Sequence, residues 1–409
     1  MSERQDLQGR RIVLGLSGGI ACYKSAELVR LLTRHGAEVR VAMTPAAESF
    51  ITAVTLQALS GQPVVTSQWD TREPNNMPHI NLGRWAEVIL IAPASADFMA
   101  QLAQGRSDEL LSLLCLARPR ETCDLLVAPA MNREMWSHPA TQRNAAQLQA
   151  DGAVLLGPGH GDQACGEFGD GRMLEAAELL DAVIAHFQPK VLKGRRLLIT
   201  AGPTFEPFDP VRGITNHSSG KMGFAMARAA AEAGAQVTLV AGPVHQPTPP
   251  GVQRINVTTA QQMYDAVVPV AAAHDIFVAT AAVADWRPAN LNEHKIKKEG
   301  HKAVPTFELT ENPDILAAVA ALPQAPYCVG FAAESEQLLT HARAKLARKK
   351  LPLIVGNLGP ATFGKDDNAL LVIDAHTHYP LPADGGSADK LTLARQLMLD
   401  IAQRLQDRP

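Results

Sequence analysis

The amino-acid sequence predicts an α/β protein built from two doubly wound, Rossmann-like domains, and three observations carry this prediction. A strand, a glycine-rich turn, a helix and a parallel strand begin twice, first at Arg11 and again at Arg196. The 409 residues exceed the ~250–300 residues that a single core usually holds. Hydrophobic residues make up 46% and aromatic residues only 5%, which suits sheets of Val, Ile, Leu and Ala better than an aromatic-rich β-sandwich.

The two openings share a turn that is compatible with phosphate binding. The strand from Arg11 breaks at Ser17–Gly19, and a helical run follows. The strand from Arg196 leads through the glycine-containing segment Ser218–Phe224 into a second helical run. Because each glycine-rich turn opens a helix, the sequence predicts two nucleotide or cofactor sites.

The remaining elements of the first half follow in order. Its strands are expected at Ile12–Leu16, Val39–Met43, Val88–Ala92, Leu125–Ala128 and Ala153–Leu156. A helical run over Leu174–Phe187 closes this half, and a short polar link leads from Gln188 to Gly194. We place the boundary near residue 190, which gives domains of residues 1–189 and 190–409.

The second half alternates in the same way but ends differently. Its strands are expected at Arg196–Thr200, Gln236–Val240, Ile276–Ala279, Cys328–Phe331 and Leu353–Val355. Ala369–Asp374 and His378–Leu381 are typical of a hairpin, and a last helix is expected from about Ser387. Two irregular loops rich in Pro and Gly cover residues 203–218 and 285–305. Loops of this length in compact domains are usually functional or disordered.

Charge and cysteine usage exclude several classes of protein. The net charge of −3 and the pI near 6.5 indicate no basic surface for nucleic acid or anionic membranes. The apolar runs are strand-sized and no apolar leader is apparent, so we expect neither a membrane span nor a signal peptide. The five cysteines are an odd number without CxxC spacing, which argues against disulfides and thiolate zinc sites and favours the cytoplasm.

Several small polar residues follow strands of the first half, at the edge where such sheets bind ligands. Ser17, Gly18 and Gly19 open a helix whose free N–H groups favour an anion, although a plain tight turn fits equally well. Thr44 and Ser95 place hydroxyls after the next two strands. Ser95 is also a candidate N-cap, and both interpretations can hold together.

Three further residues have side chains suited to catalysis. Asn132 follows the fourth strand and could cap the next helix or present its amide to a substrate carboxylate. His79 lies in the polar stretch Asn75–Asn81, which is read as a loop where a histidine is most often only surface. Cys165 lies in a glycine-dense segment that is typical of a flap carrying a reactive thiol.

These motifs together resemble the FMN-dependent phosphopantothenoylcysteine decarboxylases over residues from about 10 to 187. The resemblance implies a flavodoxin-like flavoprotein domain that decarboxylates a peptide-linked cysteine. It implies that His79 is the catalytic base, Asn132 holds the substrate carboxylate and Cys165 is the proton donor. The implied FMN contacts are Ser17, Gly18, Gly19, Thr44 and Ser95. Asp97 departs from the Asn that many members of the wider flavoprotein group carry.

The second half is similar to phosphopantothenate–cysteine ligases over residues from about 195 to 400. The matching segments are Ala201–Pro207, Asp209–Arg212, Ile214–Gly223, Ala281–Trp286, Lys295–Lys298, Asn312–Ile315 and Gly330–Glu334. The resemblance implies that CTP, with Mg²⁺, activates the phosphopantothenate carboxylate as an acyl-cytidylate, which the cysteine amine then attacks. No residue pattern identifies a protein ligand for the metal ion.

A triphosphate and a carboxylate repel each other, so the ligase reaction needs cations to hold them in line. Lys295, Lys297 and Lys298 supply charge from a loop, although a solvated basic run is the ordinary interpretation of such a cluster. Lys345 and Lys349 share one helix face at i, i+4 spacing. The implied nucleotide contacts are Ala279, Thr280, Ala281, Asp285, Lys295, Asn312, Pro313, Asp314, Ile315, Phe331, Lys345 and Lys349.

The resemblance further implies that Asn216 handles the acyl-cytidylate. The stretch Val355–Leu358 departs from the family's Ala-Asn-Asp, which leaves the role of the 355–367 loop open. The whole pattern implies a bifunctional, cytoplasmic enzyme of coenzyme A biosynthesis acting on 4′-phosphopantothenate, cysteine and CTP. It also implies a homo-oligomer with trimers of the flavin domain and dimers of the ligase domain, which suggests a dodecamer.

Two alternatives belong to other classes. An NAD(P)-dependent oxidoreductase with duplicated Rossmann domains would require a full G-x-G-x-x-G turn with an acidic ribose residue, which neither turn shows. A non-catalytic flavin-binding regulatory subunit would not need His79, Asn132 and Cys165 together. The absorbance spectrum separates bound flavin from nicotinamide, and an assay for carbon dioxide release tests the regulatory alternative.

Overall fold

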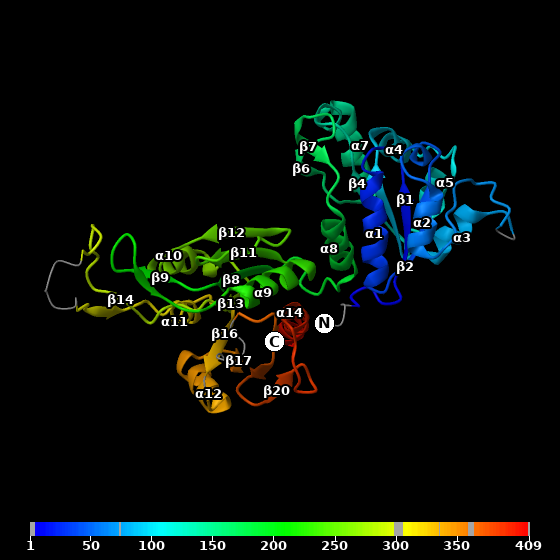
Figure 1. The fold of residues 1–409 in the computed structure, drawn as a ribbon. Coiled ribbons are helices and arrows are strands. Elements are labelled where there is room, and N and C mark those ends of the chain that lie inside the picture. Colours follow the sequence, from blue (N-terminus) through cyan, green and yellow to red (C-terminus); the bar gives the residue numbers. More distant parts are fainter. Residues whose placement is uncertain (1–4, 73–74, 298–305, 335, 359–363, 408–409) are drawn as a thin grey trace. The chain divides into compact units, whose positions relative to one another are not determined.

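The computed structural model describes residues 5–72, 75–297, 306–334, 336–358 and 364–407. The chain forms two compact units, Met1–Phe187 and Gln188–Pro409 (Figure 1). This division falls two residues before the boundary placed from sequence. Each unit has its own sheet with helices on both faces, so each has its own hydrophobic core.

The sheet of the N-terminal unit is parallel and has the strand order β2-β1-β3-β4-β5. Its strands are β1 (Arg11–Leu16), β2 (Glu38–Met43), β3 (Val88–Ala94), β4 (Asp124–Pro129) and β5 (Val154–Leu155). All five lie where the sequence predicts strands. The order is that of flavodoxin-like folds, in which β1 and β3 diverge at a switch point that binds ligands.

Alternating side chains of the strands build one core on each face of this sheet. Ile12 and Leu14 contribute to the core under α1 and α8, whereas Val13 contributes to the core under α3, α4, α5 and α7. The helices are α1 (Cys22–Arg34), α2 (Ala53–Ser60), α3 (Pro78–Trp85), α4 (Ala96–Gln104), α5 (Leu110–Ala117), α6 (Arg133–Ser137), α7 (Pro139–Ala150) and α8 (Ala176–Phe187).

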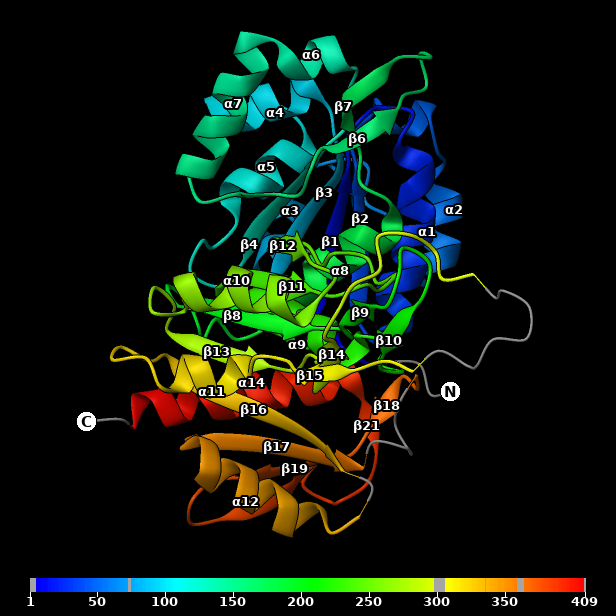
Figure 2. The same cartoon turned by 90° about the vertical axis from the view of Figure 1, so that its left-hand side faces the viewer.

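The glycine-dense segment that the sequence reads as a flap is an antiparallel hairpin of β6 (Gly159–Asp162) and β7 (Phe168–Arg172) (Figure 2). Its turn carries Cys165. Gly171 has φ +128°, and a Cβ there would lie 2.5 Å from the Met131 carbonyl oxygen. The Met131 N–H also donates to the Gly171 carbonyl at 2.9 Å. Glycine is therefore what allows the hairpin to lie directly on the segment after β4.

The sheet of the C-terminal unit has eight strands in the order β12-β11-β8-β13-β16-β17-β19-β20. The strands are β8 (Arg196–Ala201), β11 (Gln236–Ala241), β12 (Val252–Asn256), β13 (Ile276–Ala279), β16 (Tyr327–Glu334), β17 (Leu353–Leu358), β19 (Leu370–Ile373) and β20 (His378–Leu381). The first six are parallel, and β19 and β20 form the predicted antiparallel hairpin. The parallel part has the Rossmann order 3-2-1-4-5-6, with its switch point between β8 and β13.

Among the described residues of this unit, five helices cover the two faces of the sheet. They are α9 (Lys221–Glu232), α10 (Ala260–Ala271), α11 (Ile315–Ala320), α12 (Leu338–Lys349) and α14 (Lys390–Gln406). Helices α9 and α14 pack on one face, and α10, α11 and α12 on the other. The last helix begins three residues later than predicted, because Asp389 is its N-cap and accepts from the N–H groups of Leu391 and Thr392.

The sequence reading of two irregular loops is wrong in part. The first contains the hairpin of β9 (Phe205–Pro207) and β10 (Gly213–Thr215), and β14 (Trp286–Pro288) of the second pairs with β15 (Leu309–Glu311). The edge strand β12 is also absent from the prediction. These strands are short and partly exposed, so pairing rather than an apolar run defines them. Another short pair joins β18 (Asp367–Asn368) to β21 (Ala388–Asp389).

Within the parts of the chain that the structure describes, every helix is too short or too polar to cross a bilayer.

Candidate active sites

The switch point of the N-terminal unit is held together by Ser17. This side chain is 1% exposed, and its Oγ donates to the Pro93 carbonyl at 2.9 Å and accepts from the Ser95 N–H at 2.8 Å. The ends of β1 and β3 are thereby linked. Ser95 is also the N-cap of α4, and Thr44 Oγ1 accepts from the Ala47 N–H at 3.2 Å. All three hydroxyls therefore lie at the switch point and hydrogen-bond to its backbone.

The turn after β1 has the backbone features of an anion site. A Cβ on Gly18 would lie 2.6 Å from the Ala46 Cβ, whereas the space beside Gly19 is open. Among the described residues, no group accepts a hydrogen bond from the Gly18 or Gly19 N–H. Both precede α1, whose N-terminal end favours negative charge. The backbone thus offers donors to an anion without needing a cationic side chain.

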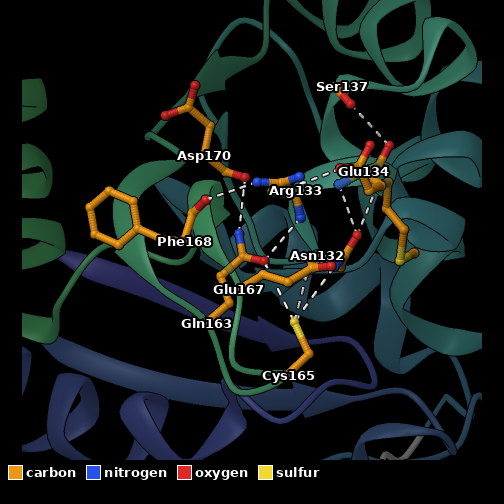
Figure 3. A network of polar contacts seen from close by, with 10 residues as sticks. Asn132, Arg133, Glu134, Ser137, Gln163, Cys165, Glu167, Phe168 and Asp170 are labelled. Carbon is orange, nitrogen blue, oxygen red and sulfur yellow. Dashed lines mark hydrogen bonds and ion pairs between the residues drawn. The ribbon is translucent and has the colours of Figure 1, made fainter.

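Asn132 and Cys165 are brought together in one polar network (Figure 3). Asn132 Nδ2 donates to the Cys165 Sγ at 3.5 Å and to the Glu167 carboxylate. Its Oδ1 accepts from the Glu134 N–H at 2.8 Å as the N-cap of α6. The capping interpretation of Asn132 is therefore confirmed, and the other end of its amide faces the cysteine. That Asn132 holds a substrate carboxylate stays a prediction.

Cys165 is the exposed cysteine of the chain, and the other four are buried. Burial raises the pKa of the Cys115 thiol strongly and that of Cys123 to about 11, which keeps both protonated. The Cys165 Sγ lies 3.7 Å from Glu167 Oε2 and 3.9 Å from Gln163 Oε1. A solvent-accessible thiol beside hydrogen-bonding groups can exchange its proton, whereas the buried thiols cannot.

The sequence predicts a loop at His79, and this prediction is wrong. His79 lies in the first turn of α3. Pro78 starts this helix, because its fixed φ suits the first helical position. The His79 side chain is half-buried, and its buried Nδ1 has no hydrogen-bond partner within the described residues. Within the same residues no hydrogen bond joins His79 to Asn132 or Cys165.

The C-terminal unit has a cavity of about 830 Å³ at its own switch point. Segments that follow β8, β13, β16 and β17 contribute to its wall. The predicted residues that line it are Asn216, Ala279, Thr280, Ala281, Asp285, Asn312, Pro313, Asp314, Ile315, Phe331, Lys345 and Lys349. Lys295 is not among the lining residues; it lies exposed after β14, and Lys298 lies outside the described residues.

Asn312 and Asp314 shape one wall of the cavity. Asn312 donates from its side chain to the Ala284 carbonyl and from its backbone to the Asp285 carbonyl, both at 2.8 Å. Its Oδ1 accepts from Arg287 at 3.0 Å. Asp314 is the N-cap of α11. These contacts fix the Asp285 turn against the start of α11, so two predicted binding segments form one rigid wall.

Lys345 and Lys349 lie on the same face of α12, as predicted. The Lys349 Nζ is 2.6 Å from a carboxylate oxygen of Asp314, and the Lys345 Nζ donates to the Phe331 carbonyl at 3.0 Å. Burial, together with the charge of Lys349, lowers the pKa of Lys345. Burial opposes ionisation of Asp314, but hydrogen bonds from Lys349 and Ala317 lower its pKa overall.

Three further cations, which were not predicted, line the cavity. They are Lys221, Arg348 and Lys390. The Lys221 Nζ is 2.7 Å from Asp366 Oδ1, and the buried Lys390 donates to the Lys365 carbonyl. Lys221 lies inside a matching motif and could have been included. Lys390 is a single lysine at the start of the last helix, and no local signal marks it.

Asn216 follows β10 directly and lines the cavity, with its Nδ2 donating to the Ala282 carbonyl at 2.9 Å. Asn357, from the stretch that departs from the family pattern, also lines the cavity, while residues 359–363 of the adjoining loop lie outside the described residues. In the described part of the chain no group of three or more His, Cys, Asp or Glu side chains could hold a metal ion.

Comparisons with known proteins cover both units. A family model described as Flavoprotein matches residues 1–188, and one described as the DNA/pantothenate metabolism flavoprotein C-terminal domain matches residues 192–405. The coenzyme A biosynthesis bifunctional protein CoaBC of Vibrio cholerae is 50% identical over 382 residues, covering 92% of this chain and 95% of its own length. That of Escherichia coli K12 is 48% identical over 400 residues, or 96% and 97%.

Two solved structures resemble the separate units. The C-terminal domain of a CoaBC protein has 34% identity and a TM-score of 0.44, covering 54% of this chain and 100% of that chain. A mutant PPC decarboxylase complexed with pantothenoylaminoethenethiol has 33% identity and a TM-score of 0.39, covering 43% and 97%.

The two switch-point sites and the two matching families define a two-domain flavoprotein enzyme. More specifically, the chain belongs to the family of the coenzyme A biosynthesis bifunctional proteins CoaBC. The prediction of a bifunctional enzyme with a decarboxylase domain and a ligase domain is thereby confirmed. The duplicated oxidoreductase and the regulatory subunit are set aside, because the family match runs through both units.

Proposed function

We propose that the C-terminal unit joins 4′-phosphopantothenate to cysteine through an acyl-cytidylate made from CTP. The N-terminal unit then uses FMN to decarboxylate the product to 4′-phosphopantetheine. The observation that carries the ligase part is the cavity of about 830 Å³ with its cationic wall. Such a cavity has room for a nucleotide together with a second substrate, since drug-sized ligands fill roughly 300–1,000 Å³.

The first ligase step joins two anions. A carboxylate oxygen of phosphopantothenate attacks the α-phosphorus of CTP, and pyrophosphate leaves with the electrons of the broken P–O bond. Lys345 and Lys349 hold negative charge at the cavity wall, and Lys295 brings a further positive charge from its loop. Mg²⁺ is proposed to travel with the triphosphate, because Mg²⁺ is often bound mainly through phosphate oxygens and water.

The second ligase step forms the amide. The cysteine nitrogen attacks the acyl carbon, the acyl C–O bond breaks, CMP leaves and the amine loses a proton. Asn216 is proposed to donate its Nδ2 hydrogen bond to the acyl-cytidylate in place of the Ala282 carbonyl that it contacts now. A neutral amide suits this position, because it adds no charge beside an anionic intermediate.

In the decarboxylase site, Asn132 is proposed to hold the substrate carboxylate. Its Nδ2 already donates to a carboxylate, that of Glu167, so the amide is oriented for such a partner. Bound FMN would supply the redox chemistry for the substrate thiol, with its phosphate on the Gly18 and Gly19 N–H groups. His79 is proposed to take up the thiol proton, and Cys165 to donate a proton from Sγ to the product.

We also propose that the chain works in the cytoplasm as a homo-oligomer, with trimers of the flavin unit and dimers of the ligase unit. Five free cysteines support a reducing compartment. Light scattering on the purified chain tests the assembly. A monomeric mass under assay conditions would contradict it.

One experiment tests both halves of the proposed function. The chromophore is released from the purified protein by denaturation and identified by mass. In a second assay, pyrophosphate release is followed with each nucleoside triphosphate. We expect FMN, and fastest release with CTP that depends on phosphopantothenate, with CMP appearing only after cysteine is added. Preference for ATP, or a chromophore other than FMN, would overturn the corresponding half.

A further inference from the structure

The lysine loop, residues 289–308 between β14 and β15, is tied to the turn of the β9–β10 hairpin. We use its described parts, residues 289–297 and 306–308. The Asn292 N–H donates to the Phe208 carbonyl at 3.0 Å. The rings of Phe208 and Phe307 stack with centroids 4.3 Å apart. Both ends of the loop therefore contact one residue of the hairpin turn, and Figure 2 shows β9, β10, β14 and β15 close together.

A third attachment lies beside the lysine itself. The Ile296 N–H donates to Asp209 Oδ2 at 3.1 Å, and the Ile296 carbonyl accepts from Arg212 Nη2 at 2.7 Å. Arg212 Nη2 also lies 2.6 Å from Asp209 Oδ2. One ion pair thus satisfies both backbone polar groups of the residue that follows Lys295.

Asp209 is buried in the hairpin turn and hydrogen-bonded to its backbone. Its side chain is 0% exposed, and its Oδ1 accepts from the Val211 and Arg212 N–H groups at 2.8 and 2.9 Å. The Arg212 guanidinium holds the pKa of this carboxyl far below its usual value, so it remains charged at any working pH. A buried charge is costly unless it is paired and hydrogen-bonded, and here every partner serves either the turn or the lysine loop.

We propose that Asp209, both directly and through Arg212, is a positioning residue that holds Lys295 in place for acyl-cytidylate formation. The proposal rests on the role of Lys295 in the proposed function. The hairpin that carries Asp209 leads directly into Asn216, which lines the cavity. The ion pair therefore fixes the backbone of Lys295 relative to Asn216, although Lys295 itself comes from a separate loop.

The expected size of the effect follows from geometry. A displacement of a reacting group by ~1 Å can cost ~10²-fold in rate even when the altered residue is remote from the chemistry. Asp209 does not line the cavity, so its replacement leaves the wall that binds the nucleotide unchanged. The rate of activation should fall while the affinity for CTP does not.

The test uses Asp209→Asn in the full chain, which keeps the size of the side chain and removes the charge that holds Arg212. Three quantities are measured: the rate of pyrophosphate release, the dissociation constant of CTP and hydrogen exchange of peptides containing Ile296. We expect ~10²-fold slower release, unchanged CTP binding and faster exchange. Val211→Ala, on the same turn with an exposed side chain, is the matched control and should resemble the wild type.

Arg212→Lys is the second variant, used in case Asp209→Asn does not fold. It keeps a positive charge beside the buried Asp209 carboxylate and removes the planar group that also donates to the Ile296 carbonyl. It should also slow pyrophosphate release and speed exchange at Ile296. Normal exchange in folded protein of either variant would overturn the attachment itself.

A double variant separates this inference from the role of Lys295. If Asp209 acts through Lys295, adding Asp209→Asn to Lys295→Gln should slow activation no further. An equal additional loss in the double variant would overturn the positioning role. A wild-type rate for Lys295→Gln alone would refute the proposed function of that lysine, while the exchange data would still decide whether Asp209 holds the loop.

Discussion

In the N-terminal unit, residues 17–21 alone connect β1 to α1, whereas residues 202–220 separate β8 from α9 in the C-terminal unit. The longer connection contains the β9–β10 hairpin, which supports the lysine loop and leads into Asn216. Both connections lie at the switch point of a doubly wound sheet. The same topology therefore provides a binding edge in both units. The segment inserted between the first strand and its helix determines which side chains lie at that edge.

The two sites also differ in charge. The cavity of the C-terminal unit is lined by cations on three helices, namely Lys221, Lys345, Arg348, Lys349 and Lys390. The direct contacts of Cys165 are instead two amides and the carboxylate of Glu167. This difference matches the proposed reactions, since a triphosphate needs counter-charge, whereas thiol and carboxylate chemistry needs hydrogen bonds and a proton donor.

Cys165→Ser should have the largest effect, and it should affect the decarboxylase reaction. A serine hydroxyl is a far weaker acid than a thiol, so formation of phosphopantetheine should fall by ~10²–10⁴-fold. Flavin content should stay at the wild-type level, as measured by absorbance. His160→Gln on the same hairpin is the control and should remain active. Normal yield from the serine variant would remove Cys165 from the mechanism.

Asn216→Asp should separate the two ligase steps. Aspartate has nearly the same size but lacks the donor, and it places a negative charge beside the acyl-cytidylate. We expect that intermediate to accumulate while its conversion by cysteine falls ~10²-fold, the usual cost of losing one preorganised donor. Chromatography of quenched reactions with and without cysteine measures both steps. Absence of any intermediate would mean that Asn216 serves nucleotide binding or folding.

Lys349→Met should have a smaller effect, on binding rather than on chemistry. Its Nζ pairs with Asp314, which caps α11, so the change removes one cation from the wall and leaves Asp314 unpaired. We expect ~10-fold weaker CTP binding, the size of one charged hydrogen bond of ~1.5 kcal/mol. Lys350→Gln, which does not line the cavity, is the control for isothermal titration. Equal affinities of the two variants would contradict a nucleotide role for Lys349.

Glu232→Gln should leave both catalytic rates unchanged and alter only the stability of the C-terminal unit. Burial opposes ionisation of Glu232, but hydrogen bonds and charge from Arg395 and Arg228 lower its pKa below the ordinary 4.5. Breaking such a buried pair costs ~3–5 kcal/mol. Because the folded-state pKa is lowered, this loss is full above pH 4.5 and shrinks as the pH falls further. Urea unfolding across this range measures it, and a pH-independent difference would contradict the ion-pair explanation.

Except for the edge strand β12, the strands of both sheets could be predicted because they are apolar runs between turns, and the Gly-rich turns marked both switch points. The β9–β10 hairpin could not be predicted, since its residues gain their partners only from the folded unit. Its contacts with the lysine loop join positions far apart in the sequence, such as Asp209 and Ile296. The hairpin that contacts the lysine loop and leads into Asn216 was therefore predicted only as an irregular loop.

The candidate sites were predictable to a similar extent. The capping role of Asn132 could be predicted from its place after a strand, and Lys345 and Lys349 shared a helix face by spacing alone. Glu167 could not be assigned, because its contact with Asn132 depends on how the β6–β7 hairpin folds back. Lys390 likewise reaches the cavity only through the packing of α14 on α9.

The proposed function assigns a separate site to each unit. A reciprocal assay of Cys165→Ser and Lys295→Gln tests it most directly, with both reactions measured in each full-length variant. We predict that Cys165→Ser makes phosphopantothenoylcysteine at the wild-type rate and accumulates it. Lys295→Gln should make none but should decarboxylate supplied phosphopantothenoylcysteine at the wild-type rate. Loss of both reactions in either variant would contradict the account.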